Sequence, residues 1–449
     1  MKKVLPAIHL VASVCGKQRD FNGPARLTRY CVRVPCKDGE LLYHTLTGEL
    51  LLLEAGESPE DNRAELIRSR FLVPTDFDDY AFATQVRKPL ELMTAPKTGL
   101  DSCSIFTTTD CNARCFYCYE LGRKRVAMSA QTAHDAAAWI AKNANEKNLQ
   151  ISWFGGEPLF NKNVIDIMTD DLRKNGIAFR SRMVSNGYLF DEETVRQACE
   201  AWKLEKVQIT LDGTEEVYNR SKAYIYREGS AYRRVIRNIQ LLLDAGVEVH
   251  IRLNLDSANY ADLLQLCKEL PSLFPGQKDM VYISFLQEFV NKPHSFASQQ
   301  EALACYRALR ESLIASGLYI KKYLARNLSE SACMADSDHS VTILPDGRIG
   351  KCEHESEDHL VGSIYEGITD QEMVSYWKTR VWEEACRTCT YYPHCKCLRN
   401  CAWFLDGCTE MSRILRGMNL EEMILNSYEQ EKNRASASAE KPAAADGLC

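Results

Sequence analysis

The stretch that decides the fold is Thr107-Thr-Thr-Asp-Cys-Asn-Ala-Arg-Cys-Phe-Tyr-Cys-Tyr-Glu120, which places Cys111, Cys115 and Cys118 in a C-x3-C-x2-C spacing. Three thiolates on one short loop can hold three irons of a [4Fe–4S] cluster, which normally takes four cysteine ligands. The fourth iron is then open to a substrate or cofactor. A structural zinc site needs a closed set of four ligands, and the local fourth ligand is missing here. The spacing therefore predicts an iron–sulfur site with an open position.

With the aromatic Tyr117 before its last cysteine, this spacing resembles that of the radical S-adenosylmethionine (SAM) enzymes. The resemblance implies that the open iron binds the amino and carboxylate groups of SAM, and that reduction cleaves SAM to methionine and a 5′-deoxyadenosyl radical. The cofactor supplies the difficult chemistry, and the protein positions it and excludes side reactions. The alternative is a chance triplet in a cysteine-rich chain, against which companion motifs further along the chain argue.

Length and composition bound the class of protein. The 449 residues suffice for two or three domains, and a formal net charge of -6 gives no basic field to attract nucleic acid or an anionic membrane. The sequence shows neither a signal-peptide cleavage site nor a stretch of ~20 apolar residues. The 19 cysteines cluster at 111–118 and 333–408, which metal ligation in a reducing cytosol explains better than disulfides. We therefore expect a cytoplasmic protein.

Strand and helix patterns alternate between residues 100 and 316. The candidate strands are Cys103–Thr107, Leu149–Trp153, Phe179–Val184, Lys206–Leu211, Val247–Leu253 and Met280–Phe285. Helical patterns follow at roughly 129–145, 162–175, 191–202, 230–245, 259–269 and 298–316. Such βα units demand a parallel sheet with right-handed crossovers. Six units rather than eight suit the partial (β/α)6 barrel of the radical SAM family, an α/β fold with its chemistry at the C-terminal ends of the strands.

Polar motifs follow the strands at that edge. After the second strand comes Gly155-Gly-Glu-Pro158, whose glycines let the backbone approach a ligand closely. In the family, the corresponding loop contacts the SAM amino group, and Ser185-Asn-Gly187 matches a polar loop that contacts SAM in relatives. The resemblance thus implies cofactor-binding roles for Tyr117, Gly155, Gly156, Glu157, Ser185, Asn186, Arg252 and Asn254.

Polar residues also close the fourth and fifth strands. By alternation, Arg252 and Asn254 point to one side of the fifth strand, and relatives use such residues on the SAM carboxylate and ribose. A surface ion pair is the alternative for Arg252. Asp212, before Gly213, suits a substrate-facing catalytic role and a turn-capping role equally well.

A second group of cysteines begins beyond the sixth unit. Val341–Leu344, the turn Pro345-Asp-Gly347 and Arg348–Lys351 predict a hairpin that ends at Cys352. The cysteines of this group are Cys333, Cys352, Cys386, Cys389, Cys395, Cys397, Cys401 and Cys408. Their spacing resembles the SPASM domain, which carries two auxiliary [4Fe–4S] clusters.

That resemblance assigns the ligands only in part. It implies an outer cluster on Cys386, Cys389, Cys395 and Cys408, and an inner one on Cys333, Cys352 and Cys401. The C-x3-C step of the family runs here from Cys397 instead of Cys395, so Cys397 is either the fourth inner ligand or the replacement for Cys395. A zinc-ribbon-like structural site is the alternative.

Glu353 directly follows Cys352. In the sulfatase-maturing relatives an Asp holds this place and serves as a base, so the resemblance implies a catalytic role for this carboxylate. The alternative is a solvated residue of the acidic run Glu353–His359.

The chain ends predict two further parts. Residues 1–90 contain a hairpin, Arg26–Val34 with Glu40–Thr45, a helix from Ser58 to about Arg70 and a short closing strand, which together predict a winged-helix-like domain. It resembles the peptide-recognition domain of many ribosomal-peptide maturases, which binds a leader peptide by strand addition; a plain cap on the barrel is the alternative. Residues 75–100 are expected to form a linker, 411–428 an amphipathic helix and 429–449 a disordered tail.

Together these patterns predict a radical SAM peptide maturase with domains at 1–90, 100–316 and 333–410. Its radical would abstract a hydrogen from a ribosomally synthesised precursor peptide with a leader, one electron would pass to an auxiliary cluster, and a thioether, C–C or C–O crosslink would form. An electron donor such as flavodoxin or ferredoxin is expected. One alternative is a sulfatase-maturing enzyme that makes formylglycine from Cys or Ser, which the long N-terminal module and Glu353 in place of Asp disfavour. The other is a non-enzymatic, metal-stabilised binding protein.

Overall fold

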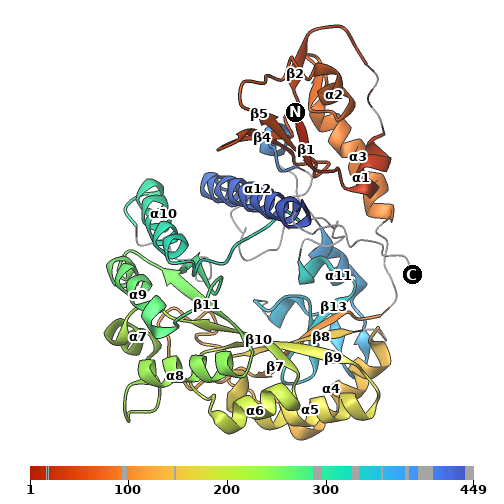
Figure 1. The fold of residues 1–449 in the computed structure, drawn as a ribbon. Coiled ribbons are helices and arrows are strands. Elements are labelled where there is room, and N and C mark those ends of the chain that lie inside the picture. The colour runs from red at the N-terminus through yellow and green to blue at the C-terminus, as the bar shows by residue number, and fades with distance from the viewer. Residues whose placement is uncertain are drawn as a thin grey trace, which may run out of the picture.

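The structure is a computed structural model that describes residues 1–16, 18, 20–93, 99–145, 148–286, 296–325, 333–354, 357–379, 384–392 and 408–439. An N-terminal domain (residues 1–93), the long helix α12 (Glu410–Ala439) and an α/β domain lie one above the other (Figure 1). Among the described residues, no helix has both the length and the apolar character that crossing a bilayer requires.

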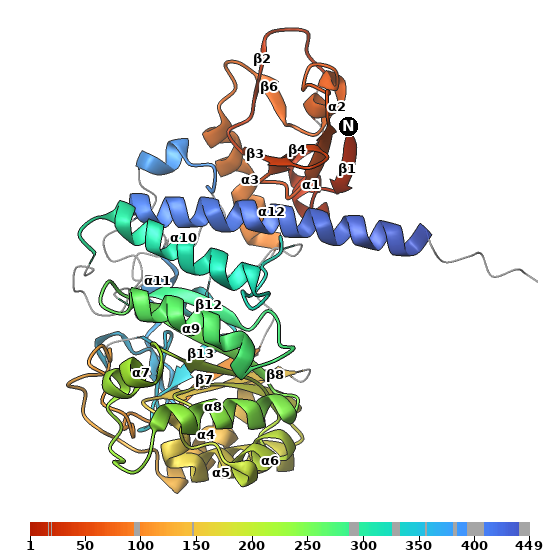
Figure 2. The ribbon, with the colours of Figure 1, turned by 60° about the vertical axis from the view of Figure 1, so that its left-hand side comes forward.

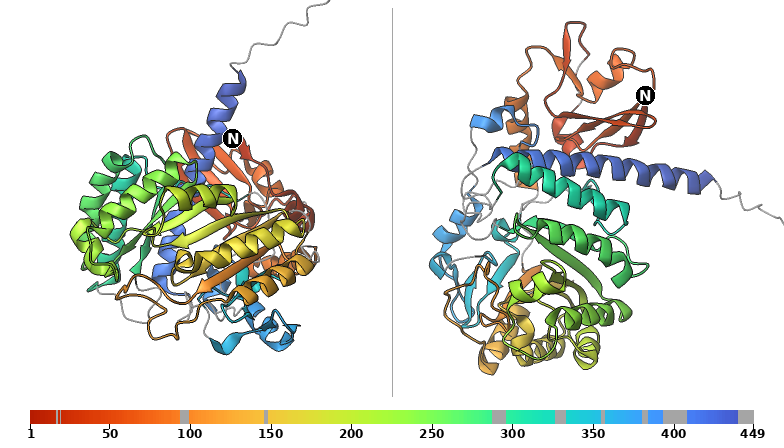
Figure 3. Two further views of the ribbon diagram at one scale, coloured as in Figure 1. Left: turned by 90° about the horizontal axis from the view of Figure 1, so that it is seen from below. Right: turned by 90° about the vertical axis from the view of Figure 1, so that its left-hand side faces the viewer.

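The α/β domain is built on a mostly parallel sheet, as predicted. The strands β7 (Ser102–Thr108), β8 (Leu149–Gly155), β9 (Phe179–Ser185), β10 (Leu204–Thr210), β11 (Glu248–Leu255) and β12 (Val281–Phe285) lie side by side in chain order. The predicted helices are α4 (Ala130–Asn143), α5 (Lys162–Lys174), α6 (Glu192–Glu200), α8 (Ala231–Asp244), α9 (Tyr260–Leu273) and α10 (Gln299–Ala315). The short helix α7 (Glu215–Lys222) was not predicted. The helices cover one face of the sheet (Figure 3).

The two faces of this sheet differ in chemistry because side chains alternate along each strand. Ile105, Ile151 and Ile209 are fully buried in the core that the helices share. Ser104 and Ser152, one residue before Ile105 and one after Ile151, point to the opposite face, and further polar residues of β10 to β12 do the same. We call this second side the inner face. It is the side on which the candidate site lies.

The sheet does not close into a barrel. Beyond β7 it continues through β13 (Ser340–Ile343), which is parallel to β7, and then β14 (Arg348–Gly350), β15 (Gly362–Ser363) and β16 (Gly367–Ile368). In the described part of the chain, β12 and β16 are therefore the two edges of one open sheet. The hairpin predicted before Cys352 is present as β13 and β14.

The N-terminal domain contains an antiparallel sheet in the order β1-β5-β4-β3. Its strands are β1 (Lys2–Leu5), β3 (Cys31–Cys36), β4 (Gly39–His44) and β5 (Leu50–Glu54), and β2 (Ala25–Leu27) pairs separately with β6 (Leu72–Pro74). The single strand predicted over Arg26–Val34 is wrong, because the chain turns at Tyr30, which is 1% exposed and accepts a hydrogen bond from the Thr45 amide.

The helices of this domain also differ from the prediction. They are α1 (His9–Cys15), α2 (Arg63–Arg68) and α3 (Asp79–Met93). The helix expected from Ser58 begins only at Arg63, because the Ser58 side chain and amide bond to Asp61 in a preceding turn. The segment predicted as a linker instead forms α3, since Ala83 and Val86 are buried against α1.

Helix α12 joins the two large parts of the molecule, as Figure 2 shows. Leu420, Ile424 and Tyr428 pack on the N-terminal sheet, while Glu422 forms a 2.8 Å ion pair with Arg310 of α10. The helix continues past the predicted end at residue 428, so residues 429–439 are helical rather than disordered. The cause is a local anchor, because Lys432 forms a 2.7 Å ion pair with Asp38 of the hairpin between β3 and β4.

Candidate active site

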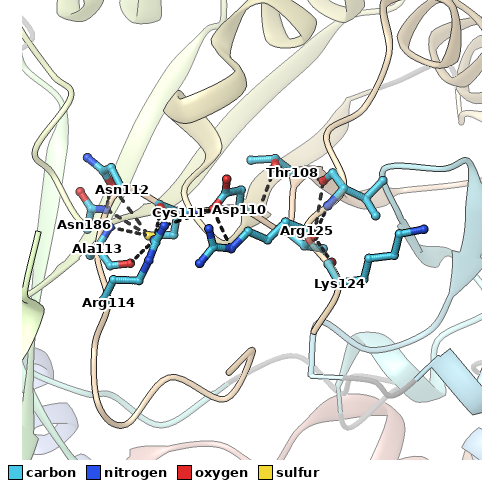
Figure 4. Close-up of polar contacts among 11 residues, drawn as sticks. Thr108, Asp110, Cys111, Asn112, Ala113, Arg114, Lys124, Arg125 and Asn186 are labelled. Atoms are coloured by element: carbon cyan, nitrogen blue, oxygen red, sulfur yellow. Dashed lines mark hydrogen bonds and ion pairs between the residues drawn. The ribbon is translucent and has the colours of Figure 1, made fainter. Parts of the chain in front are cut away.

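The cysteine loop leaves the carboxyl end of β7 on the inner face and is fastened at both ends. Thr109 Oγ1 accepts from the Val126 amide at 2.8 Å, and Asp110 Oδ1 lies 3.4 Å from Arg125 Nε and 3.8 Å from an Arg114 nitrogen. Figure 4 shows this network around Asp110 and Cys111. The loop is therefore fixed by its own charged residues before any ligand binds.

Cys111 lies against the loop that follows β9. Its sulfur accepts from the Ala113 amide at 3.3 Å and from Asn186 Nδ2 at 3.6 Å, and the same Asn186 nitrogen donates to Asn112 Oδ1 at 2.6 Å (Figure 4). Asn112 is fully buried, and its Nδ2 has no hydrogen-bond partner. A buried donor without an acceptor costs free energy, so this position favours a ligand with an acceptor atom.

The three thiols of the loop are suited to a cation. Burial raises the pKa of Cys111 to about 12 and also raises the pKa values of Cys115 and Cys118. The thiolates that metal binding requires therefore need a positive partner, which a bound metal provides. Within the described ranges, no three Cys, His, Asp or Glu side chains already lie together as a metal-binding group.

The two glycines after β8 bring this loop close to the cysteine loop, and their predicted contact with SAM stays a prediction. A Cβ on Gly155 would lie 2.2 Å from the Thr108 carbonyl oxygen, and one on Gly156 would lie 2.4 Å from that of Asp110. The Gly156 and Glu157 amides donate to these same carbonyls at 3.0 Å. The glycines thus let this loop approach the cysteine loop itself.

Glu157 ties the loops after β8 and β9 together. It is fully buried and accepts hydrogen bonds from Ser185 Oγ at 2.9 Å and from the Asn186 amide at 2.8 Å. Burial raises the pKa of this carboxyl to about 7, although those hydrogen bonds oppose the shift. The structure therefore brings together the predicted residues Glu157, Ser185 and Asn186.

Asp212 is the centre of a buried polar network that reaches the cysteine loop. Its carboxylate accepts from the Tyr117 hydroxyl, from Lys222 Nζ at 3.1 Å and from Asn254 Nδ2 at 3.0 Å. Lys222 Nζ also donates to the Tyr117 oxygen at 2.7 Å. Asp212 does not cap the turn after β10, because Asp262 does so through the Thr214 amide.

Lys222 was missed by sequence reasoning, although it is 4% exposed and supplies the positive charge of this network. It is the last residue of α7, in a run of charged helix residues, and nothing in the sequence distinguishes it from its exposed neighbours. Burial alone would lower the pKa of Lys222, but the Asp212 carboxylate and the Tyr117 phenol together raise it well above 10.5. This lysine therefore stays charged.

Arg252 and Asn254 lie on one side of β11, as predicted. Arg252 Nε donates to Asn254 Oδ1 at 2.8 Å, and its terminal nitrogen donates to Ser284 Oγ of β12 at 2.9 Å. The arginine is thus held against β11 and β12 by hydrogen bonds to side chains of both strands.

Glu353 lies on the inner face and not in a solvated acidic run. Ser104 Oγ donates to its Oε1 at 2.5 Å, and Ser152 Oγ lies 3.4 Å from the same oxygen.

The neighbouring His354 stands edge-on to the Tyr119 ring at 4.9 Å, and Tyr119 directly follows Cys118. Burial, with the charge of Arg252 adding to it, lowers the pKa of His354 to about 4, so this imidazole is neutral at pH 7. Sequence reasoning missed Ser104, Tyr119 and His354.

With this geometry established, comparison with known proteins is informative. A profile of the Radical SAM superfamily matches residues 105–270, the segment that contains the cysteine loop and β7 to β11. The chain carries a radical SAM domain. The superfamily that this profile describes comprises enzymes that use SAM-derived radicals and bind a [4Fe–4S] cluster and SAM.

Curated relatives share only part of this chain. GTP 3′,8-cyclase of Rhodopirellula baltica is 27% identical over 180 residues, which are 38% of this chain and 47% of that protein. An uncharacterized protein of Methanocaldococcus jannaschii is 29% identical over 119 residues, which are 26% of this chain and 40% of that protein. The match therefore spans less than half the length of either relative.

Solved structures resemble a larger share of the radical SAM chain. anSMEcpe with bound AdoMet and the Cp18Cys peptide has a TM-score of 0.56 and 17% identity, over 75% of this chain and 99% of that one. Streptococcus suis SuiB bound to the precursor peptide SuiA has a TM-score of 0.51 and 12% identity, over 83% of this chain and 95% of that one. At these identities the likeness concerns the fold.

The residues of the radical SAM domain fit the cofactors of the superfamily. Cys111, Cys115 and Cys118 supply three thiols, as a cluster with one open iron requires. Asn112 offers a buried, unpartnered donor, and Lys222 offers a fixed positive charge. These groups suit an anionic cluster and a ligand that carries a carboxylate.

The C-terminal cysteines are only partly described. Cys333, Cys352, Cys386, Cys389 and Cys408 lie in the described residues, whereas Cys395, Cys397 and Cys401 lie outside them. The sulfurs of Cys333, Cys352 and Cys389 each accept a hydrogen bond from the amide two residues later, at 3.2–3.4 Å, as does Cys111. An amide donor stabilises a thiolate, so this feature favours metal-ligating roles for these cysteines. Whether they hold iron–sulfur clusters or zinc stays a prediction.

Proposed function

We propose that this radical SAM enzyme is a peptide maturase that forms a crosslink within a ribosomally synthesised precursor peptide. The observation that carries the proposal is the connection between Glu353 and the cysteine loop on the inner face, through His354 and Tyr119. A carboxylate held beside a radical-generating loop suits a reaction that removes both a hydrogen atom and a proton from its substrate.

The residues of the chain have distinct tasks in this proposal. When bound, the cluster at Cys111, Cys115 and Cys118 with SAM supplies the radical that abstracts hydrogen, and the auxiliary clusters predicted at the C-terminal cysteines supply the electron acceptor. Glu353 accepts the proton that the nucleophilic group of the peptide loses. Ser104 and Ser152 hold the carboxylate in place, and such second-layer hydrogen bonds fix the orientation that proton transfer needs. Arg252, fixed by Asn254 and Ser284, orients an anionic group nearby.

The N-terminal sheet is the proposed binding surface for the leader. A peptide can extend a sheet by pairing with an edge strand, and β1 and β3 are the edges of this sheet in the described residues. Pro35 in β3 lacks an amide donor, which weakens pairing along that edge. We therefore favour β1 as the edge that takes up the leader. Two fold relatives, anSMEcpe with the Cp18Cys peptide and SuiB with the precursor peptide SuiA, have a peptide bound, which supports a peptide substrate.

A reconstituted enzyme tests the proposal directly. Anaerobic, reduced protein should produce 5′-deoxyadenosine, and addition of a precursor peptide should produce a peptide two hydrogens lighter. A variant in which Cys111, Cys115 and Cys118 are all Ala should produce no 5′-deoxyadenosine, whereas Cys305→Ala, on the outer helix α10, should retain the activity. If fully iron-loaded wild-type protein does not cleave SAM, the proposed enzymatic activity is refuted.

Glu353 is tested in the same assay. Glu353→Gln keeps the size of the side chain and the bond from Ser104, but the amide cannot accept a proton. We expect SAM cleavage to continue while crosslinked peptide falls by about 10²–10⁴-fold, the usual contribution of a positioned base. Equal crosslinking by this variant and the wild type would exclude Glu353 as the base.

A sulfatase-maturing enzyme remains the second candidate, because the fold likeness to anSMEcpe, of that type, has the higher TM-score of the two structures. The two candidates differ in product. A sulfatase-derived peptide with Cys or Ser should be converted to formylglycine only by the second. Metal analysis bears on both: about twelve irons per chain fits three [4Fe–4S] clusters, and about four irons with zinc fits a structural C-terminal site.

A further inference from the structure

We propose that the N-terminal domain forms one wall of the metal site on Cys386 and Cys389, so that metal binding and docking of this domain stabilise each other. The inference rests on the metal-ligating role proposed above for these two cysteines. It concerns a contact between the first 93 residues of the chain and a turn almost 300 residues later.

The first observation is a shared core. Cys386 is 7% exposed and belongs to one hydrophobic cluster with Val11 of α1 and Ala83 and Val86 of α3. Cys389 packs against the same cluster. Among the described residues, the other members of this cluster come from the N-terminal domain and from the turn itself, and none from the radical SAM sheet.

The second observation is a set of specific contacts around Tyr392, which is 2% exposed. Its ring lies 4.7 Å from that of Tyr80, and its hydroxyl lies 2.9 Å from Thr84 Oγ1, both on α3. Thr45 Oγ1, in the turn after β4, donates to the Thr390 carbonyl at 2.6 Å. The turn is therefore held by hydrogen bonds as well as by apolar contact, which fixes one docked orientation.

The third observation is the form of the turn itself. The Cys389 amide donates to the Cys386 carbonyl at 3.2 Å, and the Tyr391 amide donates to the Cys389 sulfur at 3.4 Å. Both thiols thus belong to one tight C-x2-C turn, a common unit of zinc and iron–sulfur sites. Amide donation to sulfur suits the thiolate that such a site requires.

Reciprocal stabilisation follows from these contacts. A metal that fixes Cys386 and Cys389 also fixes Thr390 and Tyr392, which carry the contacts with α3 and with Thr45. If bound metal raises the equilibrium constant for docking of the N-terminal domain by some factor, then docking raises the affinity for the metal by the same factor, because the two equilibria are thermodynamically linked. Loss of the tyrosine stack and its hydrogen bond should therefore weaken metal retention without any change in a ligand.

Two measurements on the full-length, metal-loaded protein test the inference. The first is the rate at which a chelator removes metal from the C-terminal cysteines, identified as the fraction absent in Cys386→Ser. Tyr392→Ala should release this fraction about tenfold faster than wild type, whereas Tyr365→Ala, at an exposed tyrosine of the β15–β16 turn, should release it at the wild-type rate. The second is hydrogen exchange of the α1 and α3 amides in wild-type protein, which should speed up when metal is removed.

The outcomes separate this inference from the function on which it rests. If Cys386→Ser holds as much metal as wild type, Cys386 is not a ligand and the inference falls, whereas the proposed function is judged separately by 5′-deoxyadenosine formation and by the mass of the peptide. A second outcome refutes only the coupling. In that outcome the metal is bound at Cys386, but Tyr392→Ala releases it at the wild-type rate and the hydrogen-exchange rates of α1 and α3 are the same with and without metal. The exchange measurement uses wild-type protein only, so it can refute the inference even if Tyr392→Ala does not fold.

Discussion

Replacing Lys222 with Met should destabilise the radical SAM domain more than the replacement of any exposed charged side chain does. Lys222 Nζ lies 3.1 Å from Asp212 Oδ2 and 2.7 Å from the Tyr117 oxygen, and both carboxylate and lysine are almost fully buried. Methionine fills the space of the lysine stem but leaves the buried carboxylate without a cation. Breaking a buried pair from one side costs roughly 3–5 kcal/mol, a large share of the ~5–15 kcal/mol that holds a typical protein folded.

Denaturant unfolding followed by circular dichroism measures this loss. Lys206→Met is the matched control, because Lys206 pairs with Glu248 at 2.9 Å in an exposed position, where such a pair contributes at most about 1 kcal/mol. Adding Asp212→Asn to Lys222→Met removes the stranded charge and should recover part of the loss. Since the pKa of Lys222 is raised above 10.5, its contribution is complete below that pH and is lost only above it. A loss under 1 kcal/mol, or no recovery in the double variant, would refute the buried network.

Three further predictions concern the loops and the domain arrangement. Because the pKa of Glu157 is raised to about 7, its contribution to stability is full below about pH 4.5 and lost as pH rises through 7. Glu157→Gln should therefore flatten the fall in wild-type stability measured between pH 5 and 8. Gly156→Ala, whose Cβ would lie 2.4 Å from the Asp110 oxygen, should lower iron incorporation, whereas Gly23→Ala, in open space, should match wild type. Deletion of residues 1–93 should lower the thermal midpoint, by exposing the apolar face of α12; an unchanged midpoint would contradict this.

The regular part of the fold could be predicted from the sequence because each element carries its own periodic pattern. The strands of the radical SAM sheet are apolar on the helix side, and caps such as Ser129 and Ser298 mark helix starts. Elements without a strong pattern were missed. Helix α3 was mistaken for a linker because residues 75–100 contain Pro89 and Pro96, and its stability comes from burial of Ala83 and Val86 by α1, a distant contact.

The residues of the candidate site also fall into two groups, those that a sequence motif predicts and those that no motif marks. Cys111 follows β7 and Asn254 lies near the end of β11, and a motif placed at the end of a strand predicts its own position at the sheet edge. Lys222 and Ser104 have no motif, because their importance depends on which residues the fold brings next to them. The contact of Gly156 with the Asp110 carbonyl was not predicted, since the sequence indicates a close approach of the backbone but not the neighbour that it approaches.

Helix α12 and the C-x2-C turn together determine how far the N-terminal domain can move. The domain is held on one side by Leu420 and Ile424 of α12 and on another by Tyr392 of the turn, and α12 is itself fixed to α10 by the Arg310–Glu422 pair. A single hinge cannot release three separate contacts at once. In the proposed function, a leader peptide on the N-terminal sheet is presented by a domain that contacts both α12 and the C-x2-C turn, and the segment after the leader spans the remaining distance to the inner face.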